Sequence, residues 1–126
     1  AEQFILPIIK DAVICYPDNG ASRRYLLDGP SITLLKVRDQ ATGEITKIEF
    51  NYMALSFTNI KNKRIVIVDD ICDGGRTFIE AAKLLKEAGA AQVDLYVTHG
   101  IFSKGIKPLT DAGICDIFTY RGKVNE

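Results

Sequence analysis

The segment Arg64–Thr77 constrains the fold more than any other part of the chain. It begins with four apolar, β-branched residues, Ile65–Val68. A short run of this kind predicts a strand that is buried on both faces, as in a parallel sheet. The acids Asp69 and Asp70 and a glycine turn follow, and apolar residues at helical spacing predict a helix over 77–88. The order strand, loop, helix predicts an α/β fold.

The loop between this strand and this helix has the composition of a phosphate site. It contains an acid, two glycines and a cation, which are Asp73, Gly74, Gly75 and Arg76, and Thr77 then begins the predicted helix. Open α/β sheets bind ligands at the carboxyl ends of their strands, and a helix N-terminus favours phosphate. Asp69 and Asp70 would repel a phosphate, so we expect them to bind sugar hydroxyls or a magnesium ion beside it. The alternative is a buried strand followed by a polar turn and a capped helix.

A second predicted strand, residues 12–16, also ends in a turn. The turn contains Asp18, Gly20, Arg23 and Arg24, and Ser22 is placed to cap a short helix through Leu27. Successive Asp, Asn and Gly residues favour a turn, and arginine offers planar donors to phosphate oxygens. These residues suit a diphosphate held through magnesium, with Asp18 as a metal ligand. The alternative is a polar turn whose arginines face solvent.

Residues 31–37 and 45–50 predict a β-ribbon with a turn at Thr42-Gly43. Lys36 and Arg38 are two positions apart, so their side chains point to the same side of an extended chain. They are candidates for binding a negatively charged group. A solvated basic pair at a strand end is the alternative.

The rest of the chain predicts one further crossover and a short helix. Residues 92–97 predict a strand, so that strand, helix and strand form a right-handed parallel crossover. His99, the only histidine, follows this strand; it is a possible phosphate or ribose contact or a structural residue. We expect a helix over 107–112, a last strand over 114–119 and a frayed polar tail over 121–126.

Composition excludes some classes of function. The 126 residues predict one domain, and 16 basic residues balance 16 acidic ones, so no nucleic-acid or membrane-binding surface is expected. No apolar run approaches the roughly 20 residues of a membrane span. Cys15, Cys72 and Cys115 are odd in number and widely spaced, which favours reduced thiols in a cytoplasmic protein.

Several of these stretches resemble the carboxyl-terminal half of the ribose-phosphate pyrophosphokinases, which are also called phosphoribosyl pyrophosphate synthetases. Residues 68–77 are similar to the ribose-phosphate loop of the type I phosphoribosyltransferase fold. They match it at Asp69, Asp70, Asp73 and Thr77 and depart from it at Gly74, where Thr is usual, and at Arg76, where Gly is usual. Residues 17–24 resemble the family's diphosphate loop, 36–38 its Lys-x-Arg element, and Thr-His-Gly-Ile-Phe-Ser at 98–103 its string after the next strand.

The resemblance implies a fold and a reaction. The fold is a three-layer α/β domain, with a mostly parallel sheet, helices on both faces and a β-ribbon flap. The reaction moves the diphosphate of ATP onto the 1-hydroxyl of ribose 5-phosphate, with Mg²⁺. Residues 73–77 would hold the 5-phosphate, and Asp69 and Asp70 would bind ribose hydroxyls and magnesium. Asp18, Gly20, Arg23 and Arg24 would hold the diphosphate, with Asp18 also on magnesium, and Lys36 and Arg38 would stabilise the transition state.

Residues 1–126 are therefore expected to form a single domain that is one half of a longer, homo-oligomeric enzyme. In this family an amino-terminal half of the protein supplies most adenine contacts. No stretch of the present sequence is suited to that role, so we expect this half to be missing from it. Two alternatives stay open. One is a non-catalytic, ribose-phosphate-binding regulatory subunit. The other is a phosphoribosyltransferase that consumes phosphoribosyl diphosphate, which would need a base-binding hood.

Overall fold

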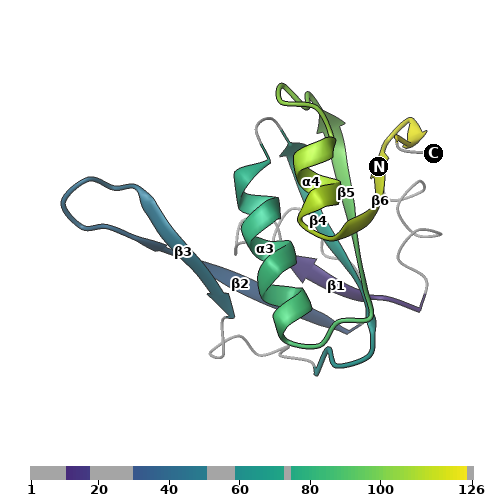
Figure 1. Cartoon of the computed structure of the whole chain (residues 1–126), viewed down its shortest axis with the longest axis horizontal. Helices are drawn as coiled ribbons and strands as arrows, with labels where there is room; N and C mark the ends of the chain where they lie inside the picture. Colours follow the sequence, from purple (N-terminus) through teal and green to yellow (C-terminus); the bar gives the residue numbers. More distant parts are fainter. Residues whose placement is uncertain (1–10, 18–29, 51–58, 73–74, 125–126) are drawn as a thin grey trace.

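The described strands form one seven-stranded sheet in the order β3-β2-β1-β4-β5-β6-β7 (Figure 1). The computed structural model describes residues 11–17, 30–50, 59–72 and 75–124, except the side chains of residues 38, 45–47, 71 and 72. The strands are β1 (Val13–Tyr16), β2 (Ser31–Arg38), β3 (Ile45–Phe50), β4 (Arg64–Cys72), β5 (Gln92–Gly100), β6 (Ile114–Thr119) and β7 (Gly122–Lys123). Only β3 and β7 pair antiparallel, which confirms a mostly parallel sheet.

Strand β4 lies in the middle of the sheet and is buried on both faces. Ile65 and Ile67 pack into one core cluster, whereas Val66 and Val68 pack into a second cluster. All four side chains are fully buried. Alternate residues of a strand point to opposite faces, so the continuous apolar run fills both cores, as predicted.

The two described helices, α3 (Arg76–Glu87) and α4 (Lys107–Asp111), cover the same face of the sheet (Figure 1). Phe78 and Leu85 of α3 and Leu109 of α4 pack with Ile65 and Ile67 in one cluster. Both helices were predicted within one residue of their observed ends. The short helix predicted after Ser22 lies outside the described residues. Among the described helices, none combines the length and the apolar content needed to cross a bilayer.

Helix α3 ends as its sequence predicts, because Gly89 takes a backbone conformation that disfavours other residues. Its φ is 99°, in the left-handed region. The Gly89 N–H donates to the Lys86 carbonyl at 3.0 Å, and the Ala90 N–H donates to the Leu85 carbonyl at 3.1 Å. This pair of bonds is a Schellman motif, and it satisfies carbonyls that the helix end leaves without partners.

Strands β2 and β3 form the predicted ribbon, which projects from the sheet (Figure 1). Asp39 organises its turn: the Asp39 Oδ1 accepts the Ala41 N–H at 2.7 Å, and the Asp39 carbonyl accepts the Gly43 N–H at 2.8 Å. Val37 pairs with Lys47 and Arg38 with Ile45, so the extra residue of a bulge belongs to β3. Strand β2 therefore continues without interruption through Arg38.

Two strands are longer than predicted, and the structure has one strand near the carboxyl end that was not predicted. The pairing of β4 with β5 continues to Cys72 and Gly100, whereas the apolar runs end at Val68 and Val97. Each strand supplies the other's backbone partners, so the ladder extends past the apolar residues. The predicted frayed tail instead contains β7, which pairs antiparallel with β6.

Candidate functional site

The two predicted phosphate loops leave the sheet from neighbouring strands. Strand β1 pairs in parallel with β4, with Cys15 opposite Ile67. Their carboxyl ends therefore lie at the same edge of the sheet. Pro17, the last described residue after β1, is buried. The four predicted diphosphate residues Asp18, Gly20, Arg23 and Arg24 lie outside the described part of the chain, as do Asp73 and Gly74.

Asp69 and Asp70 lie within the last part of β4, not in the loop that follows it. Asp69 is 9% exposed, and its Oδ1 accepts the backbone N–H of Asp70 at 2.9 Å. Asp70 is half-buried. The alternation of β4 places Asp69 on the face that α3 covers and Asp70 on the opposite face. Both carboxylates are held by a paired strand at the edge where we expect the ligand.

The start of α3 has the backbone geometry of an anion site. Gly75 precedes the helix with a φ of 82°, and its carbonyl accepts the Ile79 N–H at 2.9 Å. The first turn of α3 contains no acidic residue, and no side chain caps it among the residues described. The first N–H groups of a helix have no partners within the helix, so they are directed at the loop.

Arg76, which stands where Gly is usual in the family pattern, does not take a backbone conformation that requires glycine. It is the first residue of α3, and its φ is not positive, because Gly75 takes the left-handed conformation. The Arg76 side chain is exposed, and Thr77 beside it is partly buried. The guanidinium therefore adds positive charge to the helix N-terminus without backbone strain.

The predicted catalytic cations lie on the ribbon. Strand β1 ends at Tyr16, opposite Thr33, so β2 runs five residues further along the same direction. Lys36 is half-buried on this extension, and Arg38 ends the strand. Figure 1 shows the ribbon extending away from the carboxyl end of β4. The structure thus places Asp69, Gly75 and Thr77 at one edge but does not fold the ribbon over them.

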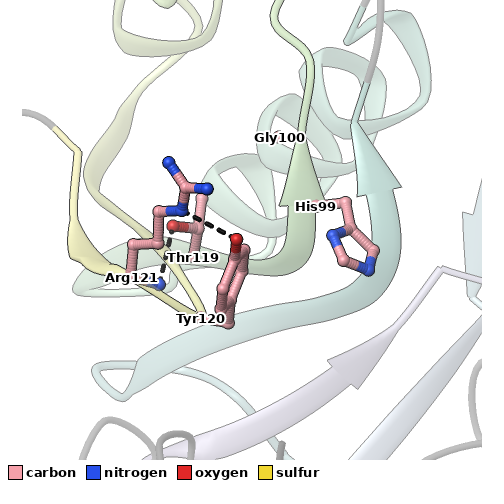
Figure 2. Close-up of a pocket in the computed structure, with 5 residues that line it drawn as sticks. All are labelled: His99, Gly100, Thr119, Tyr120 and Arg121. Atoms are coloured by element: carbon pink, nitrogen blue, oxygen red, sulfur yellow. Dashed lines mark hydrogen bonds between the residues drawn. The ribbon is translucent and has the colours of Figure 1, made fainter.

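His99 lines a pocket at the carboxyl ends of β5 and β6 (Figure 2). The open pocket has a volume of about 290 Å³ and is lined by His99, Gly100, Thr119, Tyr120 and Arg121. The His99 ring meets the Tyr120 ring edge to face, with 5.6 Å between the ring centres. His99 lies opposite Ile71 in the pairing of β5 with β4, so this pocket is next to the predicted ribose-phosphate loop.

Tyr120 and Arg121 were not predicted as site residues, because Tyr120 follows the last predicted strand and Arg121 begins the segment expected to be frayed. They form the turn between β6 and β7, in which Thr119 pairs with Gly122. Glycine with a φ of 108° at position 122 allows this tight reversal. A glycine that follows the predicted strand with two residues between them was the available signal for a hairpin.

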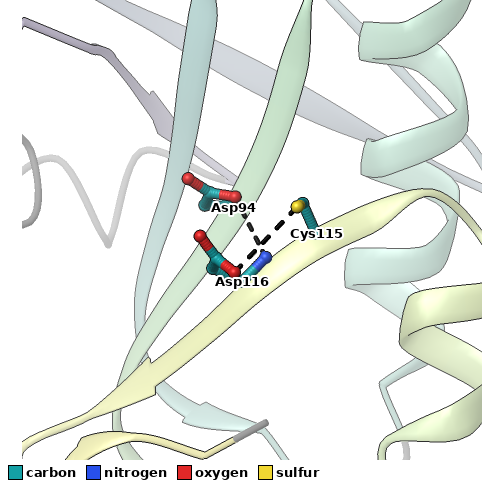
Figure 3. Close-up of side chains that lie close together, drawn as sticks. All are labelled: Asp94, Cys115 and Asp116. Atoms are coloured by element: carbon teal, nitrogen blue, oxygen red, sulfur yellow. Dashed lines mark hydrogen bonds between the residues drawn. The ribbon is translucent and has the colours of Figure 1, made fainter. Parts of the chain in front are cut away.

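A buried acid, Asp94, also escaped prediction (Figure 3). It is fully buried, and it accepts hydrogen bonds from Arg64, from the side chain of Gln92 and from the backbone of Asp116. Its carboxylate lies within 4.8 Å of possible ligand atoms of Cys115 and Asp116. Both of its oxygens already have donors, and it lies toward the amino ends of the strands. We therefore assign it to joining β4, β5 and β6.

Comparison of sequences finds ribose-phosphate pyrophosphokinases among the relatives of this chain. The chain is 34% identical to ribose-phosphate pyrophosphokinase 4 of Oryza sativa subsp. japonica, over 91% of this chain and 35% of the rice protein. It is 47% identical to the ribose-phosphate pyrophosphokinase of Mycoplasmopsis pulmonis, over 46% of this chain and 18% of that protein. The chain thus spans about a third or less of the length of these two relatives.

Comparison of structures supports the fold, and a family model matches most of the chain. The phosphoribosylpyrophosphate synthetase of Mycobacterium smegmatis superposes with a TM-score of 0.69 at 23% identity, over 94% of this chain and 39% of that one. The adenine phosphoribosyltransferase of Thermoanaerobacter pseudethanolicus superposes with a TM-score of 0.61 at 17% identity, over 93% and 74%. The model of the phosphoribosyl transferase domain matches residues 25–119. With the strand order and the helix start described above, these matches show that the chain belongs to the phosphoribosyl transferase domain family.

Proposed function

We propose that this chain is the ribose-5-phosphate-binding part of an enzyme that transfers diphosphate from ATP to ribose 5-phosphate. The observation that carries the proposal is the start of α3, where Gly75 takes a left-handed conformation and the first turn contains no acid. A phosphate placed there accepts hydrogen bonds from backbone N–H groups and interacts favourably with the helix dipole. Arg76 contributes a further positive charge, and Asp73, Gly74 and Thr77 complete the loop.

In the proposal, Asp69 and Asp70 bind ribose hydroxyls and a magnesium ion. Two carboxylates at a sheet edge fit Mg²⁺, which prefers oxygen ligands and keeps several water molecules. Asp69 is oriented by its hydrogen bond to the Asp70 N–H, and Asp70 is the more exposed of the two. Asp18 is the third proposed metal ligand. When bound, magnesium neutralises part of the negative charge of the diphosphate.

Cationic side chains are proposed to bind the diphosphate and to stabilise the transition state. Gly20, Arg23 and Arg24 are proposed to hold the diphosphate at the end of β1. The 1-hydroxyl oxygen of ribose 5-phosphate forms a bond to the β-phosphorus of ATP and releases its proton to solvent, and the bond from that phosphorus to the AMP oxygen breaks. Lys36 and Arg38 are proposed to stabilise the charge on the transferred oxygens, which requires the ribbon to move toward β4.

We also propose that residues 1–126 form one domain of a longer enzyme. The rice relative, which is about three times as long as this chain, supports this proposal. We propose that the chain is the carboxyl-terminal half of a cytoplasmic homo-oligomer and that an amino-terminal half supplies adenine contacts. Without that half, the chain is expected to bind ribose 5-phosphate and to form no product.

Calorimetry with ribose 5-phosphate and Mg²⁺ tests the binding step. We expect saturable binding that Asp73→Ala and Thr77→Val abolish. Asp111→Ala is the matched control, because Asp111 is an exposed acid on α4 whose partner is Lys107. Ribose without phosphate should not bind. Equal affinity for ribose and ribose 5-phosphate would contradict a phosphate-holding loop.

An assay of AMP release tests the reaction. The chain is mixed with ATP, ribose 5-phosphate and Mg²⁺, with and without the amino-terminal half of a ribose-phosphate pyrophosphokinase relative. AMP release only with the added half supports the proposal. Binding of ribose 5-phosphate without AMP release in either mixture would favour a regulatory subunit. Diphosphate release from phosphoribosyl diphosphate and a nucleobase would instead identify a phosphoribosyltransferase.

A further inference from the structure

The pocket around His99 is built on rigid backbone from two sides. One side is the end of β5, which pairs with β4 as far as Gly100. The other side is the two-residue turn Tyr120-Arg121, closed by pairing of Thr119 with Gly122. The Arg121 N–H also donates to the Thr119 Oγ1 at 3.2 Å. Since paired strands fix both walls, the pocket exists before any ligand binds.

The charge of the pocket is positive and is balanced by no acid in its lining. Of the five lining residues, Arg121 is a permanent cation, and none carries a carboxylate. Two cations of the described strands do pair with acids: Arg64 pairs with Asp94, and Lys123 pairs with Asp116. Arg121 pairs with no carboxylate of the described residues. A concave surface with an uncompensated cation attracts anions.

Tyr120 orients the Arg121 guanidinium. The Arg121 Nε donates to the Tyr120 hydroxyl at 2.7 Å, and the Arg121 Cζ lies 5.2 Å from the centre of the Tyr120 ring. This bond uses one of the five guanidinium N–H donors, and the other four, on the two terminal nitrogens, remain for an anion. Figure 2 shows Arg121 and His99 on the two sides of Tyr120. A guanidinium held in this way loses less side-chain freedom when it binds an anion.

We propose that this pocket is a second anion site, which binds a phosphoryl group separately from the loop after β4. Arginine and a hydroxyl donor are the groups that recognise phosphate oxygens, and the planar guanidinium binds two of them at once. The phosphoryl group is either free phosphate or part of a nucleotide. The site does not depend on the proposed transfer reaction. Of its lining residues, His99 alone was considered as a possible contact in that reaction, and the anion site is argued from Arg121 and Tyr120.

Because the chain has one histidine, NMR of its ring gives a direct reporter of the pocket. The His99 ring signals are followed while inorganic phosphate, AMP or adenosine is added at constant ionic strength. We expect saturable shifts with phosphate or AMP and none with adenosine. A tighter response to AMP than to phosphate identifies a nucleotide, and the reverse identifies free phosphate.

Three variants make the test specific. Arg121→Gln should weaken binding by about tenfold or more, because it removes charge-assisted hydrogen bonds, and Arg121→Lys should restore part of the affinity. Tyr120→Phe should give a smaller loss, since it only frees the guanidinium. Lys104→Gln is the matched control: it removes an exposed cation on the loop after β5 that does not line the pocket. Equal binding by wild type and Arg121→Gln, a response to adenosine, or no saturable response to either phosphate compound would overturn the proposal.

Discussion

The Nε of Arg64 lies 2.7 Å from the Oδ2 of Asp94, across the pairing of β4 with β5. The Asp94 side chain is fully buried, whereas the Arg64 side chain is 29% exposed. The pair therefore holds a charge inside the protein by means of a partner that reaches solvent. Its effect belongs to stability, because it lies at the opposite end of the strands from the proposed ligand sites.

Arg64→Met is expected to lower the free energy of unfolding by about 3 kcal/mol, since it leaves a buried carboxylate without its cation. Lys123→Met removes a cation from a more exposed pair with Asp116 and should cost less than about 1 kcal/mol. Urea denaturation of both variants measures the difference. Equal losses would show that Gln92 and the Asp116 backbone are enough to hold Asp94.

Gly75→Ala should lower both stability and the affinity for ribose 5-phosphate. Its φ of 82° disfavours a side chain, and the strain is expected to be about 1–2 kcal/mol. Gly43→Ala is the matched control, because Gly43 has a φ of 75° with open space around it in the ribbon turn. Both variants should lose similar stability, but only Gly75→Ala should bind ribose 5-phosphate more weakly in calorimetry. Unchanged affinity in Gly75→Ala would show that the start of α3 does not contribute to binding of ribose 5-phosphate.

Gly100→Ala should disturb the turn after β5, because an added Cβ would overlap the ring of Phe102. Phe102 itself has a φ of 50°, which keeps its ring folded back over Gly100. We expect a loss of about 1–3 kcal/mol, typical of overpacking. In the double variant with Phe102→Ala, the loss should be smaller than the sum of the two single losses. The losses are measured by thermal unfolding. Additive losses would show that the Phe102 ring moves aside for the added Cβ without lowering the free energy of unfolding.

Alkaline pH should destabilise the protein through Cys15. Burial raises the pKa of the Cys15 thiol above its ordinary value, so the folded protein keeps the proton. In the unfolded chain a thiol loses its proton above about pH 8.5. The unfolded state then binds fewer protons than the folded state, and stability falls by up to about 1.4 kcal/mol per pH unit.

The measurement is the free energy of unfolding between about pH 7 and about pH 10, the range that spans an ordinary thiol pKa. Cys15→Ala should fall less steeply than wild type above the thiol pKa, whatever its stability at neutral pH. Cys115→Ala serves as the control, because Cys115 is exposed and should leave the wild-type slope unchanged. Parallel curves for wild type and Cys15→Ala would show that the thiol ionises in the folded state as well.

Elements with a clear hydrophobic pattern were predictable from the sequence. The run at Ile65–Val68 predicted a central buried strand, and the apolar spacing before Gly89 predicted α3. The carboxyl ends of β4 and β5 were predicted too short, because their mutual backbone pairing extends β4 through two acids that resemble loop residues. The residues of β4 alone do not show how far it pairs with β5, which comes later in the chain.

The candidate site was predictable where one short stretch contains it. Gly75 and Arg76 fall in a single strand–loop–helix segment, so their neighbourhood followed from chain order. The pocket of His99 and Arg121 joins residues 22 positions apart, and Asp94 meets Arg64 across 30 positions. Such contacts depend on the order of strands in the sheet, which adjacent residues do not reveal.

The position of Asp69 and Asp70 inside a paired strand makes the two acids unequal. A shift of β4 by one residue would exchange the faces on which Asp69 and Asp70 lie. It would also move Ile65 and Ile67 to the face of the sheet opposite to the core cluster in which they pack. Consequently, selection on the hydrophobic interior also preserves which carboxylate faces the helix.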